Sequence, residues 1–138
     1  MAEAALRAEL AKAGRTDILV HSAGISAWPG AQVSPQAVLA GAEENLDISG
    51  HRAQPLDDDL MAQSDLIMAM TQDQVDLIRR RWPAHAPKVL RLFPEPENGQ
   101  PRWSGDVPDP VGLDVDEYRT ILGLIREGIQ YRLPCITA

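Results

Sequence analysis

Residues 65–74 read DLIMAMTQDQ, and this stretch combines a strand pattern with a helix start. Residues 65–70 form an apolar run with the length of a buried strand. Thr71 and Gln74 then match the capping box, in which each side chain satisfies a free backbone N–H at a helix N-terminus. The sequence therefore predicts a strand that leads directly into a helix, and we expect that helix to stop before Pro83.

Two more short apolar runs are typical of buried strands, at residues 17–21 (DILVH) and 89–92. Apolar strands that alternate with helices favour a parallel sheet covered by helices. We therefore expect an α/β fold, an open parallel sheet flanked by helices, with three strands visible. In such folds ligands bind beyond the carboxyl ends of the strands, close to helix N-termini.

Four more helices are predicted by capping residues and by apolar residues three or four positions apart. They span residues 1–14, 34 to about 45, a short turn opened by residues 57–59, and 116 to about 132. The first should bury Leu6, Leu10 and Ala13, and the last Ile121, Leu122, Leu124, Ile125 and Ile129. We expect residues 93–115, rich in Pro, Gly and Asp, to form a long loop.

The first helix lacks a residue that could cap its first turn. Its sequence, MAEAALRAELAKAG, has no Ser, Thr, Asp or Asn ahead of it to satisfy the free N–H groups. A free α-ammonium group at this end would also oppose the helix dipole. We therefore expect that a segment which normally precedes this helix is missing from the sequence.

The composition limits the functional classes. The chain has 138 residues, which suits a single domain over residues 1–138. A net charge of −7 argues against nucleic acid or an anionic membrane as the main partner. No run is apolar and long enough to span a membrane, and no signal peptide is visible. The single cysteine excludes an internal disulfide and favours a cytoplasmic location.

The first candidate for chemistry is Asp109, in GDVPDPVG at residues 105–112. Pro108 and Pro110 flank it and fix two φ angles, so the loop holds the carboxyl group in place. A carboxyl group held on a long loop suits a general acid. An ordinary turn is the alternative, because Asp-Pro is a common turn dipeptide.

A second candidate site is the small-residue run Ser22-Ala23-Gly24 with Trp28 four residues beyond it. Small residues allow a neighbouring loop to approach closely, and the indole could form the wall of a pocket. The alternative is a turn at a strand end with a partly buried tryptophan.

The remaining reactive residue types predict no metal or cofactor site. His21, His51 and His85 lack the spacing of metal ligands, although His51 could orient a loop through a hydrogen bond. Cys135 follows the last predicted helix, far from any helix N-terminus that could activate a thiolate. Residues 57–59, three aspartates, are best interpreted as a solvated helix start.

Together these motifs resemble the low-molecular-weight protein-tyrosine phosphatase family, including its bacterial protein-arginine phosphatase branch. The family has a loop of the form Cys-x5-Arg-Ser/Thr-Pro, followed by a helix that begins Met-Ala-Glu-Ala. The matching motifs run through nearly the whole chain, in order: Met1-Ala2-Glu3-Ala4, Ser22-Ala23-Gly24, Trp28, Pro35 and Ala37, His51-Arg52-Ala53, residues 65–71 and Asp109-Pro110.

The resemblance implies a mechanism in which a cysteine thiolate attacks phosphorus in a cradle of backbone N–H groups and one arginine. Asp109 would then be the general acid, Trp28 would line the substrate cleft, and Ser22 and His51 would support the site. The implied substrate is a phosphorylated protein or a small phosphomonoester, and no cofactor is implied.

The sequence departs from the family pattern at three places. The cysteine loop and the strand before it, which is central in the family's sheet, are absent. Val111-Gly112 replaces the Tyr-Tyr of the eukaryotic tyrosine phosphatases, and Thr71 replaces an aspartate. Neither a preference for phosphotyrosine over phosphoarginine nor an oligomeric state follows from the sequence.

Three hypotheses follow. The favoured one is a phosphatase that is truncated at an internal methionine and inactive by itself. The alternative is a noncatalytic pseudophosphatase that acts as a binding or regulatory module and borrows a strand from a partner. A related arsenate reductase is the third, but that reaction needs cysteines, and Cys135 alone gives it no support.

Overall fold

A computed structural model describes residues 1–94 and 105–138. The chain forms two compact units: one contains residues 1–55 and 109–138, and the other contains residues 56–108. Of the expected loop at residues 93–115, the part at 95–104 lies outside the described residues.

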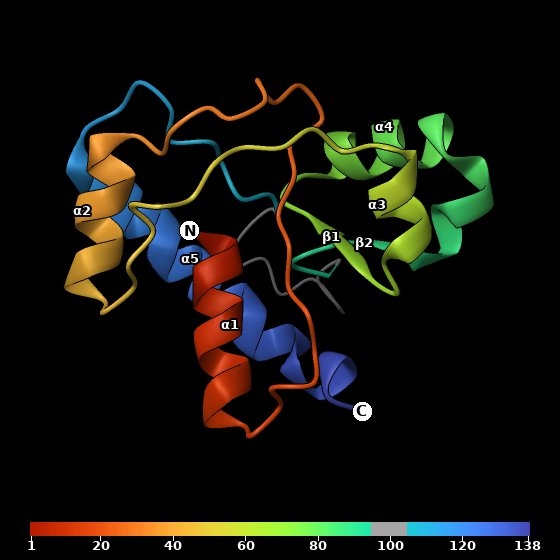
Figure 1. The fold of residues 1–138 in the computed structure, drawn as a ribbon, viewed down its shortest axis with the longest axis horizontal. Coiled ribbons are helices and arrows are strands. Elements are labelled where there is room, and N and C mark those ends of the chain that lie inside the picture. Colours follow the sequence, from red (N-terminus) through yellow and green to blue (C-terminus); the bar gives the residue numbers. More distant parts are fainter. Residues whose placement is uncertain (95–104) are drawn as a thin grey trace. The chain divides into compact units, whose positions relative to one another are not determined.

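The unit of residues 56–108 is built on a parallel pair of strands, β1 (Ile67–Ala69) and β2 (Val89–Arg91). Ile67, Met68 and Ala69 pair with Val89, Leu90 and Arg91 in that order. Helix α4 (Gln72–Arg81) and the 3-10 helix η1 (Pro83–Lys88) connect the two strands, and α3 (Asp58–Gln63) precedes them (Figure 1). The chain therefore has the expected open α/β architecture, a parallel sheet with helices packed beside it.

Local sequence signals define the ends of the helices in this unit. Thr71 caps α4 and exchanges both hydrogen bonds of the capping box with Gln74. Asp57 caps α3 through the backbone N–H of Leu60. Helix α4 buries Val75 and Ile78, which lie three residues apart on one face. The predicted capping box, the helix start at residues 57–59 and the stop of α4 before Pro83 are confirmed.

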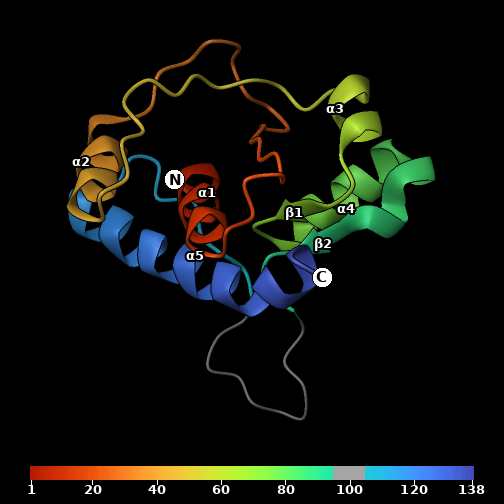
Figure 2. The same cartoon turned by 60° about the horizontal axis from the view of Figure 1, so that its bottom comes forward.

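In the other unit, the long helix α5 (Val115–Ile136) packs against both α1 (Ala2–Lys12) and α2 (Pro35–Glu43) (Figure 2). Ala37, Ala40, Ile48 and Tyr118 form a buried cluster where α2 meets α5. Ser34 caps α2 and Asp114 caps α5. Small residues on α2 allow the two helices to approach closely.

Polar side chains also tie α1 to α5. Glu9 is buried on α1, and its carboxylate accepts from Lys12 Nζ at 2.9 Å and from Gln130 Nε2 at 2.8 Å. Arg126 of α5 lies 3.5 Å from the same carboxylate. These partners lower the pKa of Glu9, the hydrogen bond from Lys12 having the largest effect. The charge on this buried side chain is therefore compensated.

Three details differ from the sequence predictions. Residues 17–21 were expected to form a strand, but the structure has turns and irregular backbone there. Within the described part of the chain, no strand pairs with this segment, and an isolated strand has no ladder to stabilise it. Ala13 is exposed and Leu124 is only partly buried. Helix α1 begins at Ala2, and Met1 in the N-cap position provides no side-chain cap, as predicted.

Candidate functional site

Asp109 opens the second stretch of the first unit, and its side chain is exposed. Its Oδ1 accepts the backbone N–H of Val111 at 3.0 Å, which closes a turn over Pro110. Leu113 N–H then donates to Pro110 O at 3.0 Å, and Gly112 has a φ of +81°. Pro110 is buried, so the turn is anchored while the carboxyl group beside it faces solvent.

Ser22 and His51 meet at one carboxylate, that of Glu3 in the first turn of α1. Ser22 Oγ donates to Glu3 Oε2 at 2.5 Å, and His51 Nδ1 lies 3.8 Å from the same oxygen. Glu3 Oε1 pairs with Arg7 one turn later at 2.7 Å. The two residues that the sequence predicted as site support are therefore brought together at the start of α1.

A small cavity of about 210 Å³ adjoins this cluster. It is lined by Ser22, Ala23, Gly24, Ala27, His51, Ala53 and Gln54. Gln54 holds two sides of the cavity together, because its side chain donates to Ser22 O at 2.9 Å and its carbonyl accepts from Gly24 N at 3.0 Å. A Cβ on Gly24 would lie 2.7 Å from Ala27 Cβ, so the tight turn requires glycine.

Trp28 stands out from the loop that follows, with 81% of its surface exposed. Two backbone hydrogen bonds hold the loop just after the tryptophan: Gly30 N donates to Ala53 O at 2.8 Å, and Ala53 N donates to Ala31 O at 2.9 Å. The alternative interpretation, a turn with a partly buried tryptophan, is therefore wrong about the burial of Trp28. Within the described residues, no hydrogen bond links Trp28 or Asp109 to Ser22 or His51.

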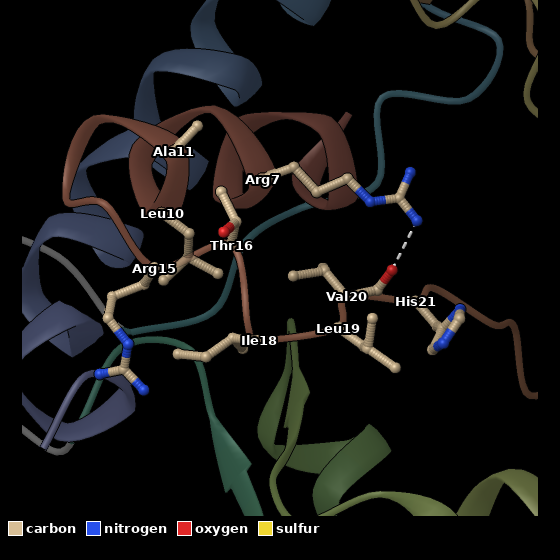
Figure 3. A pocket seen from close by; sticks show the side chains of 9 residues that line it. All are labelled: Arg7, Leu10, Ala11, Arg15, Thr16, Ile18, Leu19, Val20 and His21. Atoms are coloured by element: carbon tan, nitrogen blue, oxygen red, sulfur yellow. Dashed lines mark hydrogen bonds between the residues drawn. The ribbon is translucent and has the colours of Figure 1, made fainter.

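A second cavity of about 280 Å³ lies between α1 and residues 15–21 (Figure 3). Arg7 reaches across it and donates to Val20 O at 2.6 Å. Ile18 and Leu19 also line it, and Leu19 is 82% exposed. This is the segment that was expected to be a strand, and His21 lies at its end.

The unit of residues 56–108 fastens the chain just ahead of Asp109. Asp106 Oδ1 accepts from Arg91 Nη1 at 3.0 Å and from the backbone N–H of Gln72 at 2.9 Å. Val107 N donates to Met70 O at 2.8 Å. Both of the last two contacts are made where β1 passes into α4, so the loop begins from a defined backbone position.

The other candidates take no part in these clusters. Cys135 was expected after the last helix, but α5 runs on to Ile136, so Cys135 is exposed in its last turn. His85 lies in η1. Asp57 caps α3, and Asp58 accepts from Trp82 Nε1 at 2.6 Å, so this acidic run is a helix start as predicted.

Over residues 1–94 and 105–138, no group of three or more potential ligands could hold a metal ion. In the same residues, no helix is long and apolar enough to cross a bilayer.

Sequence reasoning missed two pairs of residues, one in each unit: Glu3 and Arg7 beside Ser22 and His51, and Arg91 and Asp106 in the unit of residues 56–108. One signal was available, because Glu3 and Arg7 have the four-residue spacing of a helical ion pair. Nothing in the sequence indicates that Glu3 meets Ser22 or that Arg91 meets Asp106, since each of these contacts joins separate elements.

The chain is similar to known proteins of one family. A family model described as low molecular weight phosphotyrosine protein phosphatase matches residues 1–133. The chain is 36% identical to the probable low molecular weight protein-tyrosine-phosphatase EpsP of Ralstonia nicotianae, over 100% of this chain and 87% of that protein. It is 34% identical to the protein-arginine-phosphatase of Bacillus subtilis, over 86% of this chain and 75% of that protein.

A solved structure extends the likeness to the fold. It is the YwlE arginine phosphatase, as a cysteine-to-serine mutant with a phosphorylated active-site serine. The TM-score is 0.81 at 31% sequence identity, and the match covers 93% of this chain and 80% of that chain.

Proposed function

This chain belongs to the low molecular weight phosphotyrosine protein phosphatase family, and we propose that it supplies the general acid and the cleft wall of a phosphatase acting on phosphorylated protein side chains. The observation that carries the proposal is the geometry of Asp109. Its carboxyl group is exposed, and the hydrogen bond that it accepts from Val111 N–H closes a turn over Pro110. We also propose that the two units belong to one phosphatase domain.

The proposed reaction has two steps. In the first, a thiolate forms an S–P bond while the bond from phosphorus to the leaving oxygen or nitrogen breaks, and Asp109 gives its proton to the leaving atom. In the second, the Asp109 carboxylate takes a proton from water, whose oxygen attacks phosphorus and releases the cysteine as a thiolate. A phosphorylated serine at the active-site position of the YwlE mutant supports a covalent intermediate of this kind.

The nucleophile of this reaction lies outside the 138 residues in the proposal. Their one cysteine, Cys135, sits at the carboxyl end of α5, where no free N–H groups are available to bind a phosphate. Residues 17–21 lack a strand partner within the described residues. This supports the proposal that a segment outside the 138 residues provides the neighbouring strand and the Cys-x5-Arg loop. We therefore propose that the chain as given is inactive by itself.

Ser22, His51 and Trp28 have supporting roles in this proposal. Ser22 and His51 converge on Glu3 in the first turn of α1, where the family's phosphate loop would join the helix. The exposed indole of Trp28 offers a flat apolar face to a substrate ring. The relatives include both a probable tyrosine phosphatase and an arginine phosphatase, so both substrate classes belong to the test.

The test begins with the DNA upstream of the Met1 codon. If it encodes a strand followed by Cys-x5-Arg-Ser/Thr-Pro, that gene product is the protein to assay. Otherwise the corresponding segment of a relative is fused ahead of Met1. We call either protein the loop-bearing protein. We expect it to release phosphate from phosphotyrosine or phosphoarginine peptides and the 138-residue chain to release none.

Asp109→Asn in the loop-bearing protein tests the role of the general acid. Removing a general acid costs roughly a hundredfold or more in rate, and the loss should be largest for substrates with poor leaving groups. Asp73→Asn is the matched control, because Asp73 is exposed in the first turn of α4. Turnover of the Asp109 variant at the control's rate would contradict the assignment.

The noncatalytic binding module is the second candidate, and the observation that favours it is that residues 17–21 pair with no strand in the part of the chain that the structure describes. It requires that the 138-residue chain folds without the nucleophile loop. A single cooperative unfolding transition of this chain, together with an upstream stop codon, would support it.

A further inference from the structure

Arg91 is a buried cation at the carboxyl end of β2, and its surroundings are built to hold it. Only 7% of its surface is exposed. Its Nε donates to Phe93 O at 2.9 Å, and its Nη1 donates to Asp106 Oδ1 at 3.0 Å. Burying a guanidinium group is costly unless it is paired and hydrogen-bonded, so this placement indicates a specific task.

Asp106 connects this cation to a second element. The same oxygen that pairs with Arg91 also accepts the backbone N–H of Gln72 at 2.9 Å, in the first turn of α4. An N–H at this position has no partner within its own helix, and a carboxylate there also benefits from the helix dipole. One carboxylate thus ties the chain at residue 106 to β2 and to α4.

The neighbouring residues are shaped to fit this contact. Gly105 has a φ of +86°, and a Cβ on it would lie 2.5 Å from Arg91 Nη2. Val107 is 3% exposed, and its N–H bonds to Met70 O at 2.8 Å. Asp106 and Val107 are therefore both held by hydrogen bonds, Gly105 leaves room for the Arg91 guanidinium group, and Asp109 follows after Pro108.

We propose that Arg91 and Asp106 form a positioning pair for the general acid. The pair fixes the backbone at residue 106, from which the chain continues through Val107 and Pro108 to Asp109. This inference rests on the proposed role of Asp109. Only Pro108 lies between Val107 and Asp109, and its fixed φ angle leaves few backbone rotations between the anchor and the acid. Proton transfer depends steeply on geometry, so a looser anchor slows protonation of the leaving group.

The experiment separates proton transfer from the rest of catalysis by the choice of leaving group. We would measure kcat/KM of the loop-bearing protein on 4-nitrophenyl phosphate, whose leaving group departs without a proton, and on phenyl phosphate, whose leaving group needs one. The variants are Asp106→Ala, Asp106→Asn and Arg91→Lys. Asp76→Asn is the control, because Asp76 bonds to the Gln72 side chain and not to Arg91. Thermal unfolding of every variant accompanies the kinetics.

The positioning role predicts a selective loss. Asp106→Ala and Arg91→Lys should lower kcat/KM on phenyl phosphate about tenfold, and 4-nitrophenyl phosphate should stay within about twofold. Asp106→Asn should retain more activity on phenyl phosphate, because its amide oxygen can still accept from Arg91 and Gln72. If Asp106→Ala does not fold, the Asn and Lys variants still test the selectivity.

Other results overturn the inference in distinguishable ways. An equal loss on both substrates would mean that the pair only stabilises the fold, and no loss on either would mean that Asp109 needs no such anchor. If Asp109→Asn itself fails to discriminate between the two substrates, the proposed acid is wrong and the positioning role falls with it. If Asp109→Asn discriminates and the Asp106 variants do not, only the positioning pair is refuted.

Discussion

Ser22 and Glu3 form one of the shortest side-chain contacts in the chain, a hydrogen bond of 2.5 Å from Oγ to Oε2 between residues 19 positions apart. It joins the loop that follows residues 17–21 to the first turn of α1. Glu3 also pairs with Arg7, whose guanidinium group donates to Val20 O. Helix α1 therefore holds residues 20–22 at two points, Val20 through Arg7 and Ser22 through Glu3. The segment is held by side chains in place of a strand ladder.

Ser22→Ala is therefore expected to destabilise the protein by about 1–2 kcal/mol, because it removes a hydrogen bond to a charged and largely buried acceptor. Ser26→Ala is the control, since Ser26 lies exposed in the same loop. Urea unfolding of both variants measures the difference. Equal midpoints for the two variants would show that the Ser22 contact does not stabilise the fold.

Glu9 gives a prediction for the pH dependence of stability. The hydrogen bond from Lys12 and the other partners lower its pKa in the folded protein. A carboxyl group with a lowered folded pKa stabilises the fold above its unfolded pKa, and that contribution disappears as the pH falls through the folded value. Glu9→Gln should therefore cost about 1 kcal/mol at pH 7, and the difference from wild type should shrink below about pH 4.

The control for Glu9 is Glu127→Gln, an exposed position on α5. Guanidinium unfolding at a series of pH values between 3 and 7 measures both variants (roughly the range over which a carboxyl group titrates). If the free energies of unfolding of Glu9→Gln and wild type differ by the same amount over this range, the ionised Glu9 carboxylate does not stabilise the fold.

Gly105 and Gly112 form a matched pair for testing the Arg91 contact. Both have positive φ, at +86° and +81°, so alanine strains the backbone at each. Only at Gly105 would the new Cβ meet another group, Arg91 Nη2 at 2.5 Å. Gly105→Ala should lower the melting temperature clearly more than Gly112→Ala, whose cost is about 1 kcal/mol. Equal losses at both positions would mean that Arg91 moves aside without cost.

The sequence predicted best where the signal was local. Thr71 and Gln74 cap α4, and Asp57 caps α3, because each bond spans only three residues and needs no other element. The strand at residues 17–21 was predicted wrongly for the opposite reason. Its apolar character is a strand pattern, but a strand forms only beside a partner, and within the described residues none pairs with it.

The site residues show the same contrast between local signals and contacts that join separate elements. Ser22, His51, Trp28 and Asp109 came from motif resemblance, and their roles stay predictions. The structure adds contacts beside Ser22 and His51 and in the chain ahead of Asp109, and these could not be read from the sequence. Glu3 meets Ser22, and Asp106 meets Arg91, only because separate elements bring them together. Resemblance can name reactive groups, whereas their supporting contacts depend on tertiary packing.

Trp28 gives the last prediction, which addresses substrate binding. Its side chain is 81% exposed, so Trp28→Ala should change the free energy of unfolding by less than about 0.5 kcal/mol. If the indole forms the wall of the substrate cleft, the same change removes a ring contact worth about 0.5–1.5 kcal/mol, a rise of about two- to tenfold in KM for an aryl phosphate. Trp28→Phe keeps a ring and should retain most of the affinity.

Inorganic phosphate, which has no ring to stack, serves as the internal control, because its inhibition constant against the loop-bearing protein should not change. A rise in both the KM and that inhibition constant would show instead that Trp28 shapes the phosphate site itself, and no change in either would remove it from the cleft.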